Sequence, residues 1–305
     1  MTMATTKSWI KAARLRTLPL ALSGILTGSA LAVFYGAFNL TVFILALTTA
    51  TLIQVFSNFA NDYGDFLKGT DNQQRLGPTR TLQAGEISSA EMKKGMGVVG
   101  GLSFVLGVAL VFAGTWQFSQ IAFFSFIALG ILALLAAYFY TAGKKSYGYI
   151  GLGDLSVFLF FGLLPVIGVF FLHANFFETA VILPAISMGL FSAGVLNLNN
   201  MRDIENDKTS GKITMAVQMG SRNSRIYHLA IIGGGWLAAL VFTLHQQRSP
   251  GQWLFILSLP LFLRDLVRIC KTTDARQLDP FLKRLALSTL AFTLLFCLGL
   301  ILSGR

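Results

Sequence analysis

The sequence predicts an all-α protein, a polytopic bundle in which about nine helices cross a membrane. Three observations predict this fold class. Only 12% of the 305 residues are charged, against roughly 25% in soluble domains, and 54% are hydrophobic. The mean hydropathy is +0.66. Apolar runs of about 17 to 25 residues, long enough to cross a hydrocarbon core roughly 30 Å thick, recur along the chain, and a helix satisfies its own backbone hydrogen bonds in lipid.

Nine apolar runs are the expected spans, in an order set by the polar segments between them. The first follows a basic segment, 7–16, and ends in small residues at 30–32, a pattern that a signal peptide also shows. We favour a retained helix, because small residues are also common where membrane helices pack. The second and sixth spans lead into long polar loops. In order, the spans are 18–35, 40–60, 96–114, 121–140, 155–172, 177–196, 226–244, 253–269 and 285–302.

The basic residues lie almost entirely on one side of these spans. Alternate loops hold 22 of the 24 Lys and Arg residues, and only Arg248 and Arg305 fall on the other side. The positive-inside rule makes the charged side cytoplasmic, which predicts a multi-pass inner-membrane protein with a cytoplasmic N-terminus. The net charge of +11 is then an orientation signal, and nucleic-acid binding is not expected. The charged loops are 1–17, 61–95, 141–153, 197–225 and 264–284.

Five aspartates form two clusters, which follow the second and the sixth spans. Offsets of three, four, seven or eight residues place each cluster, with an Asn at its start, on one helical face at the membrane edge. The clusters are 141 residues and four crossings apart, so they emerge on the same side. This predicts one domain, 1–305, containing a four-helix pseudo-repeat, about 18–140 and 155–270, and an extra helix, 285–302. The clusters are Asn58, Asp62, Asp65 and Asp71, and Asn199, Asp203 and Asp207.

These carboxylates favour a bound cation. Carboxylates on one helical face repel one another, and desolvation at the membrane edge raises the cost. Mg²⁺ would offset the charge, since it takes one or two protein carboxylates together with phosphate oxygens and water. Neighbouring cations would grip the same phosphate oxygens and stabilise a leaving diphosphate. Those cations are Lys68, Arg75 and Arg80 after the first cluster, and Arg202, Lys208 and Lys212 around the second.

Several weaker signals leave alternatives open. The two polar loops, about 35 and 29 residues long, could be solvated, turn-rich caps, but two matched clusters favour a site. Tyr138 and Tyr140 fit either contact with an allylic cation or diphosphate, or anchoring at the membrane interface. Asn58, Asn61 and Asn199 fit either contacts within the site or hydrogen bonds between helices. The 27 Phe residues are expected to face lipid or to line a tunnel.

Three stretches of sequence carry a family resemblance. The first cluster reads NDYGDFLKGTD at 61–71 and is followed by RLGPTR at 75–80. The second reads NNMRDIENDK at 199–208, and RLRTLP at 14–19 precedes the first span. Together they resemble the motifs of the UbiA superfamily of intramembrane aromatic prenyltransferases. Their details are most similar to the branch that prenylates 1,4-dihydroxy-2-naphthoate in menaquinone biosynthesis.

The resemblance implies both a fold and a reaction. The fold is a nine-helix bundle around a central cavity, and the donor is an allylic polyprenyl diphosphate bound with Mg²⁺. The acceptor is an aromatic acid, 1,4-dihydroxy-2-naphthoate, which loses its carboxylate as CO₂ and gives a demethylmenaquinone. The expected metal ligands are Asp62, Asp65, Asp71, Asp203 and Asp207, and the further catalytic residues are Lys212 and Tyr140. The expected substrate contacts are Asn58, Asn61, Lys68, Arg75, Arg80, Arg16, Lys144, Asn199 and Arg202.

One segment departs from the family pattern, and it bears on the acceptor. A Tyr followed by a Gly-Pro-type turn is expected in the segment 138–145, but the Pro is missing here. Tyr140 and Lys144 lie in this segment. We expect either Lys144 or Arg16 to hold the carboxylate of the acceptor.

Two other functions also fit parts of the sequence. An enzyme for another aromatic acceptor, of the 4-hydroxybenzoate or homogentisate type, would use the same donor site. A cation-coupled secondary transporter would also carry paired acids within a repeated bundle. The acids here lie at one membrane face, and no helix centre carries a charge, which disfavours the transporter. Prenyl chain length, the identity of the acceptor and the oligomeric state stay open.

Overall fold

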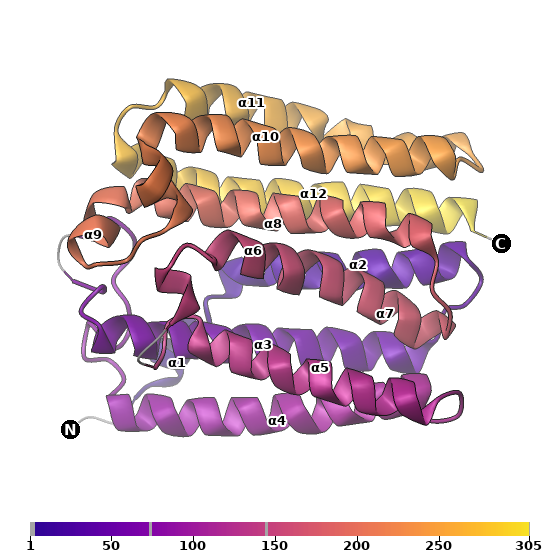
Figure 1. Cartoon of the computed structure of the whole chain (residues 1–305), viewed down its shortest axis with the longest axis horizontal. Coiled ribbons are helices and arrows are strands. Elements are labelled where there is room, and N and C mark those ends of the chain that lie inside the picture. Colours follow the sequence, from indigo (N-terminus) through magenta and orange to yellow (C-terminus); the bar gives the residue numbers. More distant parts are fainter. Residues whose placement is uncertain (1–3, 73–74, 144–145, 305) are drawn as a thin grey trace.

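The chain folds as a bundle of long helices that lie side by side (Figure 1). The computed structural model describes residues 4–72, 75–143 and 146–304. Within these ranges every regular element is a helix, which confirms the predicted all-α class. Eight helical segments there are long and apolar enough to cross a membrane. They are Thr6–Phe34, Leu40–Leu67, Ser89–Thr115, Gln120–Phe139, Gly153–Ala174, Thr179–Arg202, Met215–His245 and Ala275–Ser303.

The individual helices subdivide these segments. Short 3-10 turns occur at Leu15–Thr17, Tyr147–Tyr149, Thr179–Val181 and Ala275–Leu278. The α-helices are α1 (Thr6–Ala13), α2 (Leu18–Phe34), α3 (Leu40–Leu67), α4 (Ser89–Thr115), α5 (Gln120–Phe139), α6 (Gly153–Phe158), α7 (Leu164–Ala174), α8 (Ile182–Arg202), α9 (Ile204–Thr209), α10 (Met215–His245), α11 (Leu259–Lys271) and α12 (Asp279–Ser303).

The ninth expected span, 253–269, takes a different form. It begins as a 3-10 helix, Pro250–Ser258, and continues as α11. Figure 1 shows α11 alongside α10, and the two are in contact. Charged residues inside α11 interrupt its apolar pattern, so this part of the bundle is amphipathic rather than continuously hydrophobic. The described chain therefore has eight apolar spans and one split, amphipathic member.

An aromatic cluster fills the space between α8, α10, α12 and the 3-10 segment before α11. The ring of Phe191 lies 5.0 Å from the rings of Phe262 and Phe292, and Trp236 lies 5.1 Å from Phe292. Phe191, Phe255 and Phe292 are fully buried. The expectation that the Phe residues only face lipid or line a tunnel is therefore wrong for these rings. Each contributes dispersion and edge-to-face contacts that hold the helices together.

Two glycines let α8 approach the helix that contains α6 and α7. A π-helical turn, Leu159–Leu163, separates α6 from α7. Gly162, in this turn, lies directly against Gly189 of α8, and a Cβ on Gly162 would overlap the backbone of Gly189. Close backbone approach through small residues is a common way to pack membrane helices. The turn also directs Phe160 and Phe161 toward the interior cavity described below.

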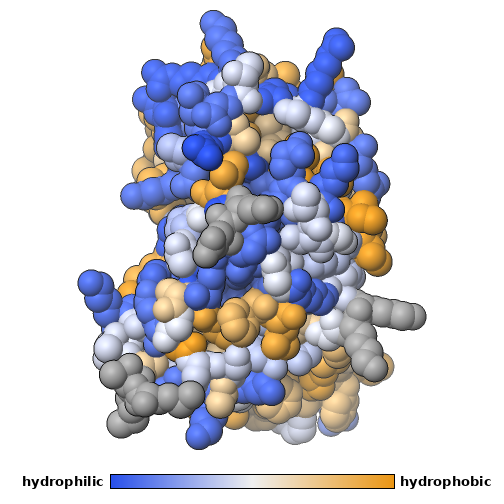
Figure 2. Space-filling model, turned by 90° about the vertical axis from the view of Figure 1, so that its left-hand side faces the viewer, coloured by the Kyte–Doolittle hydropathy of each residue, from blue (hydrophilic) through white to orange (hydrophobic). Residues whose placement is uncertain are grey.

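The polar ends of α3 and α8 lie at the same end of the bundle. In Figure 1 both helices run from right to left, and their last turns reach the end that carries α9 and the N-terminus. Figure 2 looks onto this polar end, where hydrophilic residues cover most of the surface. The two acidic clusters thus emerge on one side, as the sequence predicts. The sequence predicts that the halves 18–140 and 155–270 are pseudo-repeats within one domain, and we propose the same for the folded chain.

The N-terminal segment was expected to be a loop but forms a helix. The side chain of Thr5 caps α1 by accepting from the amide of Ser8. Trp9 packs against Phe59 of α3, with ring centroids 5.3 Å apart. The helix ends at Arg14, whose φ of 48° is left-handed and turns the chain toward α2. This ending places Arg14 over the end of α3, where the first acidic cluster lies.

The close contact of Gly162 gives a prediction about stability. We expect Gly162→Ala to destabilise the protein by about 1 to 3 kcal/mol, because the added methyl group overlaps α8 and forces the helices apart. Thermal unfolding in detergent would measure the loss as a lower Tm. Gly233→Ala in α10 is the matched control, since a Cβ there meets no atom within 4 Å. An unchanged Tm for Gly162→Ala would show that the approach of α8 does not depend on this glycine.

Candidate functional site

The structure brings the two acidic clusters together at the polar end of the bundle. Asp62 and Asp65 lie in the last turns of α3, while Asp203 follows α8 and Asp207 lies in α9. All four side chains are buried. The amide of Asn206 donates a hydrogen bond of 3.1 Å to the carbonyl of Thr70, which joins the two loops directly. The site is therefore assembled from segments more than 130 residues apart, as the sequence predicts.

Arginines from three segments surround the first cluster. Asp62 forms ion pairs with Arg14 and with Arg80, whose Nη1 is 3.4 Å from Oδ1. Asp71 lies 3.4 Å from Nε of Arg75 and 3.7 Å from Nε of Arg80. Nε of Arg75 is also 4.0 Å from Oδ2 of Asp203, so this arginine reaches both clusters.

Arg14 is a member of this site that the sequence analysis missed. Its position depends on the hydrogen bond of 2.9 Å that the side-chain amide of Asn58 donates to the carbonyl of Ala13. The same amide donates to Thr17, so Asn58 fastens the N-terminal segment to α3. Asn58 therefore makes hydrogen bonds between segments, next to Arg14, and its predicted contact with substrate stays a prediction.

Arg202 has a different environment from the other cations. It is fully buried, donates to Asp203 from Nη2 at 2.6 Å, and forms an ion pair with Asp279 at the start of α12. Its Nη2 also donates to the side chain of Asn199 at 2.9 Å. Gly77 lies against this guanidinium, where a Cβ would come within 2.8 Å of Nη2. Arg202 thus ties α8, α12 and the loop after α3 into one unit.

Lys212 accompanies the second cluster. Its Nζ lies 3.5 Å from Oδ1 of Asp207, and its backbone amide donates to the carbonyl of Asp207 at 2.8 Å. Gly211, with a φ of 71°, makes the turn that returns the chain to this position. The spacing of Asp207 and Lys212 is therefore fixed by the backbone of one tight turn.

Tyr149 is a second residue that the sequence analysis did not identify. Its hydroxyl donates to Oδ1 of Asp65 at 2.8 Å and lies 2.5 Å from the hydroxyl of Thr70. Its ring lies under Nζ of Lys68, 4.1 Å from the centroid, and under Nζ of Lys212, 5.7 Å from the centroid. One side chain from the loop between α5 and α6 thus contacts groups of both clusters. Lys68 also contacts the hydroxyl of Ser146.

Several carboxylate oxygens of the site have cations nearby but accept no hydrogen bond. Burial raises the pKa of Asp71, and the negative charge of Asp65 raises it further. Burial likewise raises the pKa of Asp207 to about 6, with Lys212 opposing the rise. Both oxygens of Asp71 and Oδ2 of Asp207 are buried and accept no hydrogen bond. Such oxygens can accept a cation at no loss of existing hydrogen bonds.

The arrangement fits a divalent cation only in combination with an anion. Within the described residues, no three His, Cys, Asp or Glu side chains already converge as a metal-binding group. Arginine side chains lie between the carboxylates instead. Mg²⁺ needs few protein ligands when phosphate oxygens complete its coordination, and arginines bind those same oxygens. The donor set is thus suited to a metal-bound phosphate ester rather than to a bare ion.

A cavity of about 430 Å³ leads from this cluster into the bundle. At its polar mouth it is lined by Asp65, Arg80 and Lys212, and deeper by aliphatic and aromatic side chains. It reaches Ala46 on α3, which is 19 residues before Asp65 and so about 28 Å away along the helix. The charged residues that line the cavity are Arg14, Arg16, Asp65, Arg80, Lys212 and Lys283, all from segments at the polar end. The central cavity predicted from the family resemblance is confirmed.

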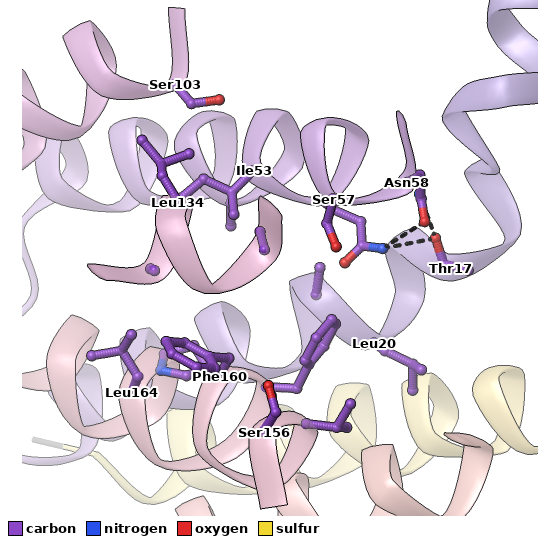
Figure 3. A pocket seen from close by; sticks show the side chains of 18 of the residues that line it. Thr17, Leu20, Ile53, Ser57, Asn58, Ser103, Leu134, Ser156, Phe160 and Leu164 are labelled. Atoms are coloured by element: carbon purple, nitrogen blue, oxygen red, sulfur yellow. Dashed lines mark hydrogen bonds between the residues drawn. The ribbon is translucent and has the colours of Figure 1, made fainter. Parts of the chain in front are cut away.

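Figure 3 shows the change in character along the cavity. At one end Asn58 and Thr17 lie within a hydrogen-bonded group, in which Gln54 donates to Thr17 at 3.0 Å and to Asn58 at 3.3 Å. Phe160, Leu164 and other apolar side chains line the part farther from that group. A ligand with one charged end and a long apolar tail matches this gradient.

The remaining predicted site residues line the mouth of the cavity or fall beyond the described chain. Asn61, Tyr140, Asn199 and Arg16 line the cavity, and Asn61 accepts a hydrogen bond from Thr141 at 3.2 Å. Lys144 lies outside the described residues. Lys283 of α12 also lines the cavity, on a helix that contacts the turn containing Arg16. Sequence spacing gave no signal for Lys283, because it is far from both motifs.

Relatives of known name are similar over nearly the whole chain. Residues 21–295 match the family model described as the UbiA prenyltransferase family. A 1,4-dihydroxy-2-naphthoate octaprenyltransferase from Haemophilus influenzae is 43% identical over 298 residues, which cover 97% of this chain and 96% of the relative. A protein of the same name from Escherichia coli is 42% identical, over 98% of this chain and 96% of the relative.

Solved structures share the fold at much lower identity. A UbiA homolog from Aeropyrum pernix K1 aligns with a TM-score of 0.65 at 15% identity, over 94% of this chain and 96% of that one. A UbiA homolog from Archaeoglobus fulgidus, described as bound to DMAPP and Mg²⁺, aligns with a TM-score of 0.58 at 17% identity, over 94% of this chain and 99% of that one.

The contacts of Tyr149 give a prediction about stability. We expect Tyr149→Phe to lower the free energy of unfolding by about 1 to 3 kcal/mol, because the buried carboxylate of Asp65 and the hydroxyl of Thr70 lose a hydrogen-bond partner. Thermal unfolding in detergent would measure the change. Tyr63→Phe is the matched control, since Tyr63 lies buried near the end of α3 and makes no side-chain hydrogen bond in the described structure. Equal effects of the two changes would contradict the bridging role of Tyr149.

Proposed function

The chain belongs to the UbiA prenyltransferase family, and we propose that it transfers a polyprenyl chain from its diphosphate to 1,4-dihydroxy-2-naphthoate with loss of CO₂, which forms a demethylmenaquinone. It is a multi-pass membrane prenyltransferase. The 43% and 42% identical relatives carry this acceptor in their names, and those names favour an octaprenyl donor. The observation that carries the proposal is a buried acidic and basic cluster at the mouth of one long apolar cavity.

In this proposal the two clusters form the donor site. Asp62, Asp65, Asp71, Asp203 and Asp207 would hold Mg²⁺, which when bound withdraws charge from the leaving diphosphate. The buried oxygens of Asp71 and Asp207 that accept no hydrogen bond support this assignment. The cations beside them would bind the diphosphate oxygens; these are Lys68, Arg75, Arg80 and Lys212. The prenyl tail would then extend down the apolar part of the cavity.

The reaction needs stabilisation of the leaving diphosphate at the mouth of the cavity and the exclusion of water from the part below the mouth. The allylic C–O bond breaks, and its electron pair leaves with the diphosphate, whose growing charge the arginines and lysines stabilise. A ring carbon of the acceptor then attacks the allylic carbon. The bond from that ring carbon to the carboxylate breaks, CO₂ departs, and the electron pair restores the aromatic ring. Apolar walls exclude water that would otherwise capture the allylic cation, and the ring of Tyr140 at the mouth is positioned to stabilise it.

Arg16 is our candidate for holding the acceptor carboxylate. Arg16 lines the cavity mouth and has no ion-pair partner in the described part of the chain, unlike Arg14, Arg75 and Arg80. Lys283 lines the same mouth and would add a second positive charge. Lys144, the other residue expected from the sequence, is retained as an alternative. Asn61 and Asn199 line the cavity, and in this proposal they contact one of the substrates.

The charge distribution also bears on the other functions and on orientation. The charged lining of the cavity lies at one end, so nothing in the described cavity supports a solute path with alternating access. We propose that the protein lies in the inner membrane with its polar end in the cytoplasm. The excess of Lys and Arg on the loops at that end supports this orientation.

Buried and exposed carboxylates of the site should respond differently to neutralisation. We expect Asp65→Asn and Asp207→Asn each to lower turnover by about 100-fold or more, because each removes a negative oxygen from the metal and diphosphate site. Glu205→Gln is the matched control, since Glu205 is exposed in the same motif. The assay follows the mass of the product from a labelled polyprenyl diphosphate, the naphthoate and Mg²⁺. Turnover of Asp207→Asn at the level of Glu205→Gln would contradict the donor site.

If Arg16 binds the acceptor, its substitution should change the KM values of the two substrates differently. We expect Arg16→Gln to raise the KM for 1,4-dihydroxy-2-naphthoate about tenfold or more, because a charge-assisted hydrogen bond to the carboxylate is lost. The KM for the polyprenyl diphosphate should stay within about twofold of wild type. Arg222→Gln, an exposed arginine of α10, serves as the control. An equal rise in both KM values would place Arg16 in the donor site instead.

A further inference from the structure

A basic pocket lies at the polar end of α11 and α12, and none of its lining residues lines the cavity. It is lined by Arg268, Lys271 and Arg284, together with Phe281 and the segment that joins the two helices. Arg268 and Lys271 are exposed and have no ion-pair or side-chain hydrogen-bond partner in the described structure. The cations of the donor site, in contrast, are mostly matched by aspartates. The pocket therefore presents positive charge without a partner from the described chain.

Fixed contacts build the walls of this pocket. Asp265, buried on α11, forms an ion pair with Arg284 of α12, which joins the two helices. Nη2 of Arg225 donates to the carbonyl of Thr272 at 2.6 Å, which fastens the end of α11 to α10. The guanidinium of Arg284 lies over the ring of Phe281, 5.1 Å from its centroid. The shape of the pocket is thus set before any ligand arrives.

An apolar stripe runs beside the basic one on α11. Leu263 and Val267 are 52% and 54% exposed, and each precedes a basic residue, Arg264 or Arg268, by one position. Residues four apart share a helical face, so Leu263 and Val267 form an apolar stripe, and Arg264 and Arg268 form a basic stripe. The two stripes differ by about 100° around the helix. A lipid acyl chain would cover the apolar stripe while its headgroup reaches the basic one.

The positive-inside rule alone does not explain the basic pocket and the apolar stripe beside it. The positive-inside rule requires basic residues near this membrane face, but it does not require them to surround a pocket next to an exposed apolar stripe. An acidic aqueous partner would match the charge but would leave the apolar stripe uncovered. A free phosphate ion would leave it uncovered as well. A ligand that carries a phosphate and an acyl chain matches both.

We propose that this pocket binds the headgroup of an anionic phospholipid from the leaflet at the polar end of the bundle. The phosphate lies between Arg268 and Lys271, with Arg284 at the wall of the pocket, and an acyl chain runs along Leu263 and Val267. This site is separate from the prenyl diphosphate site, so it does not depend on the proposed reaction. It fastens α11, an amphipathic helix, to the membrane surface.

Native mass spectrometry of the full-length protein in detergent tests the proposal. Phosphatidylglycerol and phosphatidylethanolamine with identical acyl chains are titrated, and the bound fractions give apparent Kd values. We expect wild type to prefer phosphatidylglycerol, and Arg268→Gln/Lys271→Gln to weaken its binding about 25-fold, from about fivefold for each basic residue. Lys93→Gln/Lys94→Gln removes two exposed charges from α4 at the same membrane face and should leave the preference unchanged.

Two further measurements test whether positive charge is what the pocket recognises and whether the ligand is a lipid rather than a free anion. Arg268→Lys/Lys271→Arg keeps both charges, so it should bind phosphatidylglycerol as wild type does. Excess inorganic phosphate should not displace the lipid, because it cannot cover the apolar stripe. The proposal is overturned if wild type shows no preference between the lipids, if the Gln variant binds as wild type does, or if the α4 control loses as much. Displacement by inorganic phosphate would show a simple anion site instead.

Discussion

Buried negative charge at one end of a membrane bundle is the constraint on which the rest of the site depends. Five aspartates lie buried where the end of α3 and the loop after it meet the end of α8 and α9, and isolated ionised carboxylates away from water are costly. Positive charge must occupy the same small volume. The protein supplies it from the N-terminal segment, from the loop after α3 and from the turn after α9. Oxygens of Asp71 and Asp207 that accept no hydrogen bond can take a further cation.

The fold serves this constraint by separating charge from apolar surface. α3 and α8 end at the same level, so both clusters meet at the mouth of the cavity. Below the mouth the bundle is held by close helix contacts and packed aromatic rings, which leave an apolar space open along α3. The same arrangement lets a charged diphosphate and a long hydrocarbon tail bind together, each in the surroundings that cost it least.

The sequence predicted the parts of the site that are close together along the chain. The fold class, the two clusters and their shared side follow from hydropathy and from spacing, because a helix fixes which residues share a face. Arg14 and Tyr149 were missed because their roles depend on contacts across 48 and 84 residues, which spacing does not report. Arg202 forms ion pairs with Asp203 and Asp279 that connect α8 with α12, and its predicted contact with substrate stays a prediction. The span 253–269 was expected to be one ordinary helix, but it is built from a 3-10 segment and the amphipathic α11.

The most direct test of the donor site is the binding of Mn²⁺, in place of Mg²⁺, followed by electron paramagnetic resonance with a non-reactive prenyl thiolodiphosphate. Asp65 belongs to the first acidic cluster and Asp207 to the second. One variant of each therefore tests whether the two clusters hold the same metal and diphosphate. We expect wild type to bind Mn²⁺ tightly only with the analogue, with coupling to phosphorus, and Asp65→Asn and Asp207→Asn each to lose that binding. Tight Mn²⁺ binding that needs no analogue, or that survives the change in either loop, would contradict a site shared by the two clusters.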